Sequence, residues 1–458
     1  MAMRNGDVSF WFADMGGLPA PRPPLDGDRQ VDVCIIGAGF TGLWTAYYLK
    51  VAEPALSIAV VEKDFAGFGA SGRNGGWCSG EFGWSRERYR DRAGVIAMES
   101  QLRATVEEVI RVAEAEGIAA DIRRTELLTF ACNPAQLSRL HSALAEARAW
   151  QVPRERFALI DAGAARARIR IAGAEGALVT RGVARVQPAK LVRGLAAAVE
   201  RRGVVIHEQT AVTAIAPGCV TTDRGRITAG RIVIATEGFT ARLPGRRRDL
   251  LPLNSALVVT EPLSNALWEE IGWRQHELLA DNAHAYCYAQ RTAGNRIAMG
   301  GRGVPYRFGS ALDHRGKTQA ATIADLRAIL HRLLPQTKGL RLDHAWCGVL
   351  GVPRDWCAAV AFDPQSGIGR AGGYVGLGVS TTNLAGRTLA ELLLDRRTER
   401  TGLPWVDHDT RLWEPEPLRW LGVMGMYRLY RRADRREARA GITRTSRLAA
   451  LADRLTGH

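Results

Sequence analysis

The fold is decided by the stretch Val31-Asp32-Val33-Cys34-Ile35-Ile36-Gly37-Ala38-Gly39-Phe40-Thr41-Gly42, an apolar strand that runs straight into a G-x-G-x-x-G turn. Gly37 permits the tight turn, Gly39 lets the backbone approach a pyrophosphate, and Gly42 lets the following helix pack close to the strand. Phosphates are favoured at the N-terminus of such a helix, because its first N–H groups are free. The stretch therefore predicts a dinucleotide site.

An acidic residue closes the second strand of the same unit. Residues 58–61 are apolar and are followed by Glu62, twenty residues beyond Gly42. A carboxylate at this point accepts hydrogen bonds from both hydroxyls of an adenosine ribose and disfavours a phosphorylated ribose. Strand, glycines, helix, strand and terminal acid in this order are much more specific than the glycines alone.

Composition describes a large globular protein. A chain of 458 residues is too long for one ordinary core, so we expect two joined domains with appendages. The hydrophobic share of 46% and the charged share of 24% are those of a soluble protein. Residues 31–49 are apolar, but Asp32 and three glycines mark them as a buried strand and helix, so no transmembrane segment is expected.

Cysteine usage and the N-terminus indicate a cytoplasmic location. The seven cysteines are scattered and never form a C-x-x-C pair, which is typical of reduced thiols. Residues 1–30 carry charges and a proline-rich run and lack the apolar segment of an export signal. No metal site is predicted, because neither histidines nor cysteines show metal-ligand spacing.

The net charge of +15 raises the question of a polyanionic partner. The basicity is almost wholly arginine, spread from end to end, with only five lysines. No nucleic-acid recognition motif accompanies the charge, so we expect no nucleic-acid partner.

A second glycine cluster follows the ribose acid, at Gly67-Phe68-Gly69-Ala70-Ser71-Gly72-Arg73-Asn74-Gly75-Gly76-Trp77. A nicotinamide enzyme has no need of such a loop at this position. Its glycines let backbone N–H groups face a flat cofactor, while Ser71 and Asn74 can hydrogen-bond the polar edge of that cofactor and Arg73 its charge.

These motifs carry a family resemblance. Glu62, the run at residues 69–76 and the later Gly372-Gly373-Tyr374-Val375-Gly376-Leu377-Gly378-Val379 resemble the FAD-dependent oxidoreductases of the D-amino-acid oxidase and glycine oxidase (DAO) superfamily. The chain is similar to the gamma-glutamylputrescine oxidase-like branch. The resemblance covers residues 31–394, and its motifs are specific for FAD but not for substrate.

The resemblance implies FAD as the cofactor and assigns its contacts. A helix through residues 383–387, after the glycines at 373, 376 and 378, would aim its N-terminus at the flavin and stabilise the negative charge of the reduced ring. The predicted cofactor-binding residues are Gly37, Gly39, Phe40, Thr41, Gly42, Glu62, Lys63, Ala70, Ser71, Gly72, Arg73, Asn74, Gly75, Gly76, Val212, Thr236, Gly238, Gly376, Gly378 and Val379.

The expected fold is α/β, with a Rossmann-like FAD-binding domain and an interleaved α+β substrate domain that carries a mixed β-sheet over the flavin. The pattern of strands and helices divides the chain as follows: an N-terminal extension (1–30), a discontinuous FAD-binding domain (31–90, 174–250 and 345–400), a substrate domain (91–173 and 251–344) and a basic helical C-terminal tail (401–458).

The resemblance implies oxidation of a small primary or secondary amine, an amino acid or a polyamine derivative, with hydride passing to flavin N5 and the imine then hydrolysed. A desolvated cavity favours the neutral amine, so no catalytic acid or base is assigned. Aromatic walls could hold the amine and an arginine its anionic group. The substrate-pocket candidates are Tyr286, Tyr288, Arg291, Arg302, Tyr306 and Tyr374.

Two departures from sarcosine oxidase-like members leave alternatives open. The resemblance makes O2, giving H2O2, the expected acceptor. The strand at residues 296–300 lacks the oxygen-assisting lysine of those members, so a dehydrogenase is the alternative. Cys347 falls near their flavin-linking cysteine; a covalent link is one hypothesis, and a small buried cysteine on a strand is the other.

Two further readings rest on charge. The enzyme rival is an FAD enzyme that modifies an amine on tRNA, and the rival of another class is a noncatalytic flavoprotein that binds a partner through its basic tail. The tail itself has aromatic residues followed by an arginine-rich run near residue 431. It could lie on an anionic membrane or touch an acidic partner, and more commonly such a tail docks on its own protein and keeps a solvated basic face.

Overall fold

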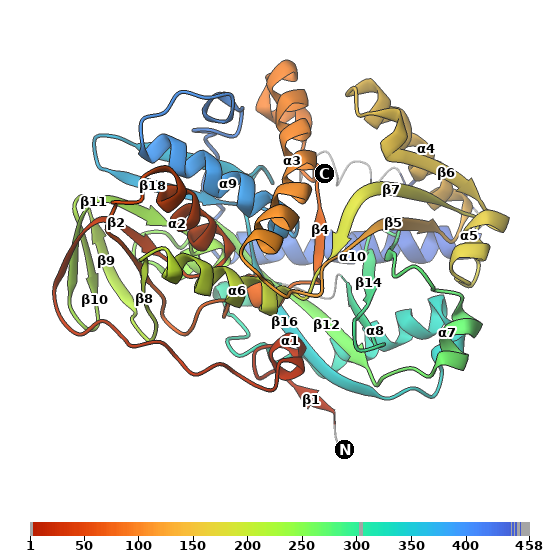
Figure 1. Ribbon diagram of the computed structural model, residues 1–458. Helices are drawn as coiled ribbons and strands as arrows, with labels where there is room; N and C mark the ends of the chain where they lie inside the picture. The colour runs from red at the N-terminus through yellow and green to blue at the C-terminus, as the bar shows by residue number, and fades with distance from the viewer. Residues whose placement is uncertain (1–2, 302–305, 441, 444, 447–448, 450–458) are drawn as a thin grey trace.

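The computed structural model describes residues 3–301, 306–440, 442–443, 445–446 and 449. The chain forms two sheets side by side, with helices packed against both (Figure 1). The smaller sheet has the order β17-β18-β11-β2-β3-β8, with β9 and β10 forming a ladder beside β11. Its strands are β2 (Arg29–Ile36), β3 (Ile58–Val61), β8 (Val205–His207), β9 (Val212–Ala216), β10 (Cys219–Thr222), β11 (Arg226–Ile234), β17 (Ala359–Asp363) and β18 (Ile368–Gly372).

The centre of this sheet is parallel and buried. β2 pairs in parallel with both β3 and β11, and β3 with β8, as expected of a nucleotide-binding unit. Helices α2 (Phe40–Ala52), α6 (Pro188–Arg201) and α9 (Gly378–Leu393) pack on it. A Cβ at Gly386 of α9 would lie 2.6 Å from Trp44 Cβ of α2, so this glycine permits the close contact of the two helices.

The larger sheet is mixed, in the order β1-β16-β12-β15-β14-β13-β5-β7-β4, with β6 paired to β7. Its strands are β1 (Arg4–Asn5), β4 (Trp77–Ser79), β5 (Arg123–Ala131), β6 (Phe157–Asp161), β7 (Gly176–Arg185), β12 (Leu251–Thr260), β13 (Leu278–Asp281), β14 (Cys287–Arg291), β15 (Ile297–Gly301) and β16 (Leu342–Val352). The remaining helices are α1 (Phe10–Asp14), α3 (Arg92–Ala115), α4 (Pro134–Ala149), α5 (Ala162–Arg168), α7 (Asn265–Ile271), α8 (Ala320–Leu333) and α10 (Leu418–Ala440). The expected α/β class with a mixed second sheet is confirmed.

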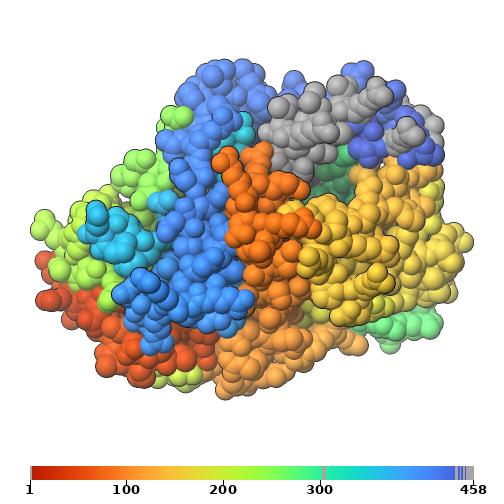
Figure 2. All heavy atoms as spheres, turned by 90° about the horizontal axis from the view of Figure 1, so that it is seen from above, coloured from red at the N-terminus to blue at the C-terminus, as the bar shows by residue number. Residues whose placement is uncertain are grey.

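Several elements lie elsewhere than our domain boundaries place them. β7 and β16, assigned from sequence to the FAD-binding domain, belong to the larger sheet, because they pair antiparallel with β5 and β12. α3, assigned to the substrate domain, buries its apolar face in the same core as α2 and α9. Seen from above, α3 and α9 adjoin on the surface (Figure 2). The apolar face of a long helix is available to either domain, and its sequence alone does not decide between them.

The N-terminal segment is part of the core. β1 adds a parallel strand to β16, and α1 buries Phe10, Trp11 and Phe12 in an aromatic cluster with Trp346. The Ser9 hydroxyl donates to Gly72 O at 2.8 Å, and Trp11 Nε1 donates to Asn74 O at 2.8 Å. The segment therefore anchors the second glycine loop through these two hydrogen bonds.

Candidate cofactor and substrate site

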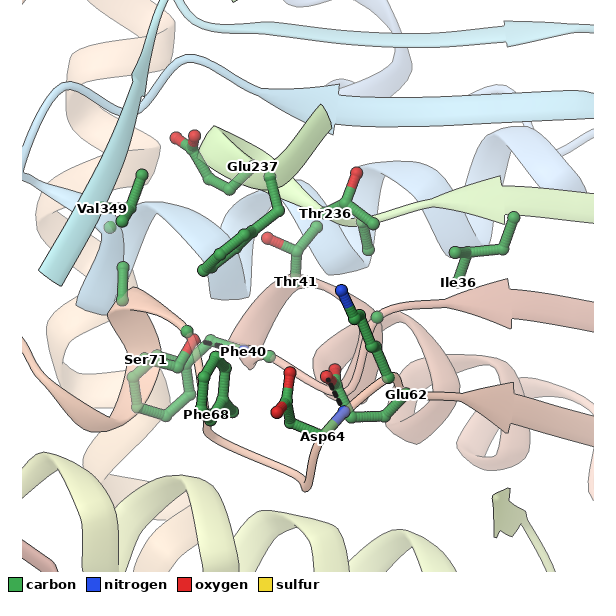
Figure 3. Close-up of a pocket in the computed structure, with 18 of the residues that line it drawn as sticks. Ile36, Phe40, Thr41, Glu62, Asp64, Phe68, Ser71, Thr236, Glu237 and Val349 are labelled. Carbon is green, nitrogen blue, oxygen red and sulfur yellow. Dashed lines mark hydrogen bonds between the residues drawn. The ribbon is translucent and has the colours of Figure 1, made fainter. Parts of the chain in front are cut away.

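A cavity of about 530 Å³ opens at the carboxyl ends of β2, β3 and β11. Side chains from the two glycine turns converge on it together with Glu62 (Figure 3). The predicted residues that line it are Gly37, Gly39, Phe40, Thr41, Glu62, Lys63, Ala70, Ser71, Asn74, Val212, Thr236, Tyr374, Gly376, Gly378 and Val379. Residues far apart in sequence thus share one cavity.

The first glycine turn is tight enough to require its glycines. Gly37 has a φ of +105°, and a Cβ there would lie 2.6 Å from Ala235 O. A Cβ at Gly42 would lie 2.1 Å from Gly37 O. Both substitutions would push the turn away from its neighbours, since real Cβ atoms do not approach so closely. Gly42 supports the cradle from behind and does not line the cavity.

Glu62 is held in place at the end of β3. Its carboxylate accepts the Ala38 N–H at 2.9 Å. It also accepts the Asp64 N–H at 3.1 Å (Figure 3). The side chain is half-buried and its carboxylate is largely shielded from water, which raises its pKa to about 7 in spite of these two N–H groups. Partners that donate hydrogen bonds would favour its ionised form.

The second glycine loop is organised by its own polar side chains. The Ser71 hydroxyl accepts the Phe40 N–H at 2.8 Å and so joins the two turns (Figure 3). Asn74 Oδ1 accepts the Gly76 N–H at 2.8 Å, and its Nδ2 donates to Ser71 O at 2.9 Å. Ser71 and Asn74 line the cavity while they fix the loop.

Arg73 points away from the cavity into the protein. Its side chain is 0% exposed, and the guanidinium donates to the carbonyl oxygens of Phe68 (2.6 Å), His314 (2.9 Å) and Cys347 (3.4 Å). Burial lowers its pKa to about 10. The structure does not bring Arg73 to a cofactor charge, because its donors are taken by carbonyls on three separate segments.

Four other predicted cofactor glycines, Gly72, Gly75, Gly76 and Gly238, also stand outside the cavity lining. At each of these glycines, another part of the chain lies closer than an added Cβ would allow. A Cβ at Gly72 would lie 2.3 Å from Gly67 O, one at Gly76 would lie 2.1 Å from Gln290 Nε2, and one at Gly238 would lie 2.8 Å from Val349 Cγ1. Their role in the structure is packing that sets the shape of the loops.

The substrate candidates separate by strand face. Tyr288 and Gln290 of β14 face the second glycine loop: Gln290 Nε2 donates to Gly75 O at 2.6 Å, and a Cβ at Gly75 would lie 2.6 Å from the Tyr288 ring. Tyr286 lies beside Tyr288, with ring centroids 6.4 Å apart, and neither of these two predicted pocket residues lines the cavity. Burial raises the pKa of Tyr288 well above its ordinary value.

Arg291 and Tyr306 do not line the cavity. Arg291 lies on the opposite face of β14, where it donates to Trp273 O at 2.8 Å and stacks over Trp268. Tyr306 is 2% exposed and is bonded to Glu416 at the start of the C-terminal helix. Arg302 lies outside the described residues. Strand alternation explains Arg291, since odd-numbered residues of β14 face away from the glycine loop.

Tyr374 lies in the cavity and closes it against the first turn. Its hydroxyl lies 3.0 Å from Thr41 Oγ1, and its backbone N–H donates to Glu237 at 3.2 Å. Glu237 also lines the cavity, and its burial raises its pKa to about 7. Its carboxylate points from the end of β11 toward β16 (Figure 3).

Cys347 is buried on β16 and is not brought to the cavity. Its Sγ lies 3.6 Å from Asp313 Oδ2 and 3.8 Å from Lys317 O, and burial raises the pKa of its thiol to about 12. A thiol with a raised pKa is a poor nucleophile. These contacts favour the hypothesis that Cys347 is a small buried cysteine on a strand over the hypothesis of a covalent link to the flavin.

Sequence reasoning missed part of the cavity wall: Asp64, Phe68, Phe239, Arg242, His314, Val349 and Leu350. His314 Nε2 lies 3.5 Å from Asp64 Oδ1 across the rim. Asp64 stands between the two glycine motifs and Phe68 within the second one, and these positions are a signal that could have identified them. The others come from distant segments, and only the fold brings them here.

The described residues include two groups with metal-ligand atoms within 4.8 Å of one another: Asp355, Cys357 and His408, and His284, Asp434 and Glu437. Within both groups the side chains bond one another or neighbouring groups, as His408 does to Asp355 at 2.7 Å. The absence of a metal stays a prediction. No described helix is long and apolar enough to cross a membrane.

Comparisons with known proteins agree with this geometry. Residues 32–392 match the family described as FAD dependent oxidoreductase (DAO). Gamma-glutamylputrescine oxidoreductase of Escherichia coli (strain K12) is 29% identical over 403 residues, covering 84% of this chain and 89% of that protein. Glycine oxidase from Geobacillus kaustophilus has a TM-score of 0.69 at 22% identity, covering 81% of this chain and 96% of that one. L-proline dehydrogenase from P. horikoshii has a TM-score of 0.67 at 20% identity, covering 83% and 96%.

The cavity also suits FAD on its own geometry. Its two glycine turns offer open backbone at the carboxyl ends of a parallel sheet, where dinucleotides bind, and Glu62 follows β3 at the edge of the same cavity. The N-terminus of α9 adjoins the same cavity through Gly378 and Val379. Since the family match spans most of the sequence and the cradle fits the family's cofactor, this chain belongs to the DAO family of FAD-dependent oxidoreductases.

Proposed function

We propose that this protein oxidises a small primary or secondary amine, an amino acid or a polyamine derivative, and that O2 is the electron acceptor. The observation that carries the proposal is the 29% identity to an oxidoreductase named for a gamma-glutamylated polyamine, over 84% of this chain. The structural relatives named for glycine and L-proline support the same class of nitrogen compound.

The cavity residues would divide the work of holding FAD. Glu62 would accept the ribose hydroxyls, and the turn at Gly37 and Gly39 would face the pyrophosphate. Ser71, Asn74 and Tyr374 would border the flavin portion. When bound, FAD supplies the chemistry by accepting a hydride from the carbon next to the amine nitrogen.

The chain itself would prepare the substrate. Tyr286 and Tyr288 offer aromatic surface beside the second glycine loop, and burial there favours the neutral form of an amine. The N-terminus of α9 offers free N–H groups that stabilise negative charge, because this helix of 16 residues has its positive dipole end at the cavity. No acid or base needs to be assigned, because a neutral amine has no proton to give up first.

The proposal is tested by an anaerobic amine screen. Amino acids, polyamines and gamma-glutamylated polyamines are mixed with the purified holoprotein, and bleaching of the flavin absorbance is followed. We expect one of these classes to bleach the flavin rapidly, with recovery and stoichiometric peroxide on admission of air. Slow recovery in air, with fast recovery on an artificial acceptor, would make the protein a dehydrogenase. A panel that bleaches nothing would contradict amine oxidation.

We predict that the affinity for FAD depends on pH through Glu62. The pKa of about 7 means that the carboxyl group is mostly protonated below this pH, whereas ribose hydroxyls donate best to the anion. The affinity for FAD should therefore rise with pH. The dissociation constant for FAD, measured with the FAD-free protein, should be about tenfold larger at pH 6 than at pH 8. Fluorescence titration with FAD measures this.

Two variants test whether Glu62 is the group responsible for the pH dependence. Glu62→Gln should bind FAD more weakly at pH 8 and lose the pH dependence. Glu53→Gln, at the exposed end of α2, should keep both the affinity and its pH dependence. An unchanged pH profile in Glu62→Gln would assign the titration to another group.

We also propose a cytoplasmic location. The seven cysteines of the chain are all free in the structure, including buried Cys34 and Cys78, which is the pattern of a reducing compartment.

A further inference from the structure

The C-terminal helix α10 is firmly docked along one side. It runs behind the larger sheet in Figure 1. Asp434 accepts the backbone N–H groups of His284 and Ala285, each at 2.9 Å. Glu437 is 1% exposed and bonds Arg139 at 2.8 Å; burial alone would raise its pKa, but His284 and Arg139 lower it to about 2. The orientation of the helix is thus fixed by buried charges.

The opposite side of α10 is a continuous solvent-facing stripe. Its members recur at spacings of three and four residues, which places them on one face of the helix. We call this set the outward stripe: Leu418, Leu421, Gly422, Gly425, Arg428, Arg432, Arg435 and Arg436, all exposed. The stripe is apolar over the first two turns and cationic over the rest.

The apolar end of the outward stripe is unusually exposed. Leu418 is 62% and Leu421 55% exposed. Phe308, which is 60% exposed, contacts the same helix, because its ring meets the edge of Trp420. These side chains are three of the eight large hydrophobic residues exposed in the described part of the chain. Their clustering on one surface marks an interaction site.

The arginines at the cationic end of the outward stripe have no acidic partner among the described residues. Among the described residues, none of the four stripe arginines forms an ion pair, whereas the inward-facing Arg419 and Arg431 pair with Glu416 and Asp325. The acidic residues of this helix, Asp434 and Glu437, face the protein. The outward stripe therefore presents four positive charges with no negative charge among them.

We propose that the outward stripe binds the surface of an anionic lipid bilayer, with α10 lying parallel to the membrane plane. Leu418 and Leu421 would enter the boundary between headgroups and acyl chains, and the arginines would meet lipid phosphates. A nucleic acid would use the arginines but leave the leucines in water, so the combination favours lipid. The proposal is independent of the substrate of the enzyme.

The test is co-sedimentation of the full-length holoprotein with vesicles. We expect binding to vesicles of phosphatidylcholine mixed with phosphatidylglycerol, weak binding to phosphatidylcholine alone, and loss of binding as salt is raised. Changing Arg428, Arg432, Arg435 and Arg436 together to Gln should lower the partition coefficient at least about tenfold.

Matched variants separate the stripe from net charge. The control carries the same four-charge change at exposed, unpaired arginines elsewhere: Arg148, Arg166, Arg226 and Arg397, each to Gln. It should retain most of the binding. Leu418→Ser with Leu421→Ser should weaken binding severalfold, and Val51→Ser with Val205→Ser, at equally exposed sites, should not. All four sets change exposed side chains, so thermal unfolding should stay near that of the parent.

Three outcomes would overturn the proposal. These are equal loss of binding in the two arginine sets, no binding to anionic vesicles at low salt, and retention of RNA through the stripe arginines without vesicle binding. The last outcome would assign the outward stripe to a nucleic acid.

Discussion

Replacing Gly42 with alanine is expected to remove bound FAD and to destabilise the protein by about 3 kcal/mol, the upper range for overpacking a core. The new Cβ would lie 2.1 Å from Gly37 O and 3.0 Å from Ile35 Cγ2. Both neighbours belong to β2 and its turn, so they cannot rotate aside as a flexible side chain can. α2 must instead move away from the strand.

That movement would act on the cofactor without touching its cavity. Gly39 immediately precedes α2, and the Phe40 N–H that meets Ser71 begins it, so a displaced helix separates the two glycine turns. The measurements are the ratio of flavin to protein absorbance after gel filtration and the midpoint of urea unfolding. A variant that purified yellow with parental stability would refute this account of Gly42.

Gly425→Ala is the matched control. It also places a methyl group on a helix, but no atom lies within 4 Å of the added Cβ. Because alanine favours the helix by about 1 kcal/mol over glycine, stability should be equal or higher. Flavin content should be unchanged.

The nucleotide turn could be predicted because its causes are local. A strand, three glycines and a terminal acid lie within residues 31–62, and each is required by the backbone geometry at its own position. The structure accordingly places Gly37, Gly39 and Glu62 around one cavity. Val212 and Thr236 also line this cavity, but they were predicted from the family resemblance and not from local geometry.

The substrate side could not be predicted as well, because its causes are long-range. Tyr306 looked available to a substrate, but Glu416, 110 residues later, binds its hydroxyl. Arg291 looked available too, yet Trp268 and Trp273 engage it on the far face of β14. The second glycine loop is also held by Trp11, because the N-terminal segment reaches Asn74. No local pattern encodes these contacts.

Arg73 shows how far a local interpretation can differ from the structure. In sequence it stands in the middle of the second glycine loop and suits an anionic ligand. In the structure it joins three segments, since its donors meet Phe68 O in the loop, His314 O in the segment before α8, and Cys347 O on β16. Its guanidinium also lies 4.3 Å from the Phe68 ring centroid. A buried cation bonded only to carbonyls is a structural tie between the nucleotide site and the larger sheet.

Replacing Arg73 with leucine should therefore cost about 3 kcal/mol of stability, because buried carbonyls lose charge-assisted hydrogen bonds that no water can replace. Arg73→Lys should recover only part of this, because an ammonium group keeps the charge but lacks the planar fork that reaches three acceptors. Urea unfolding of the holoprotein measures the order: parent above Lys above Leu. A lysine variant as stable as the parent would show that charge alone is needed. A leucine variant as stable as the parent would show that these carbonyls do not need Arg73, and the tie between the two sheets would then have to be sought in Trp346, whose Nε1 donates to Arg73 O at 2.8 Å.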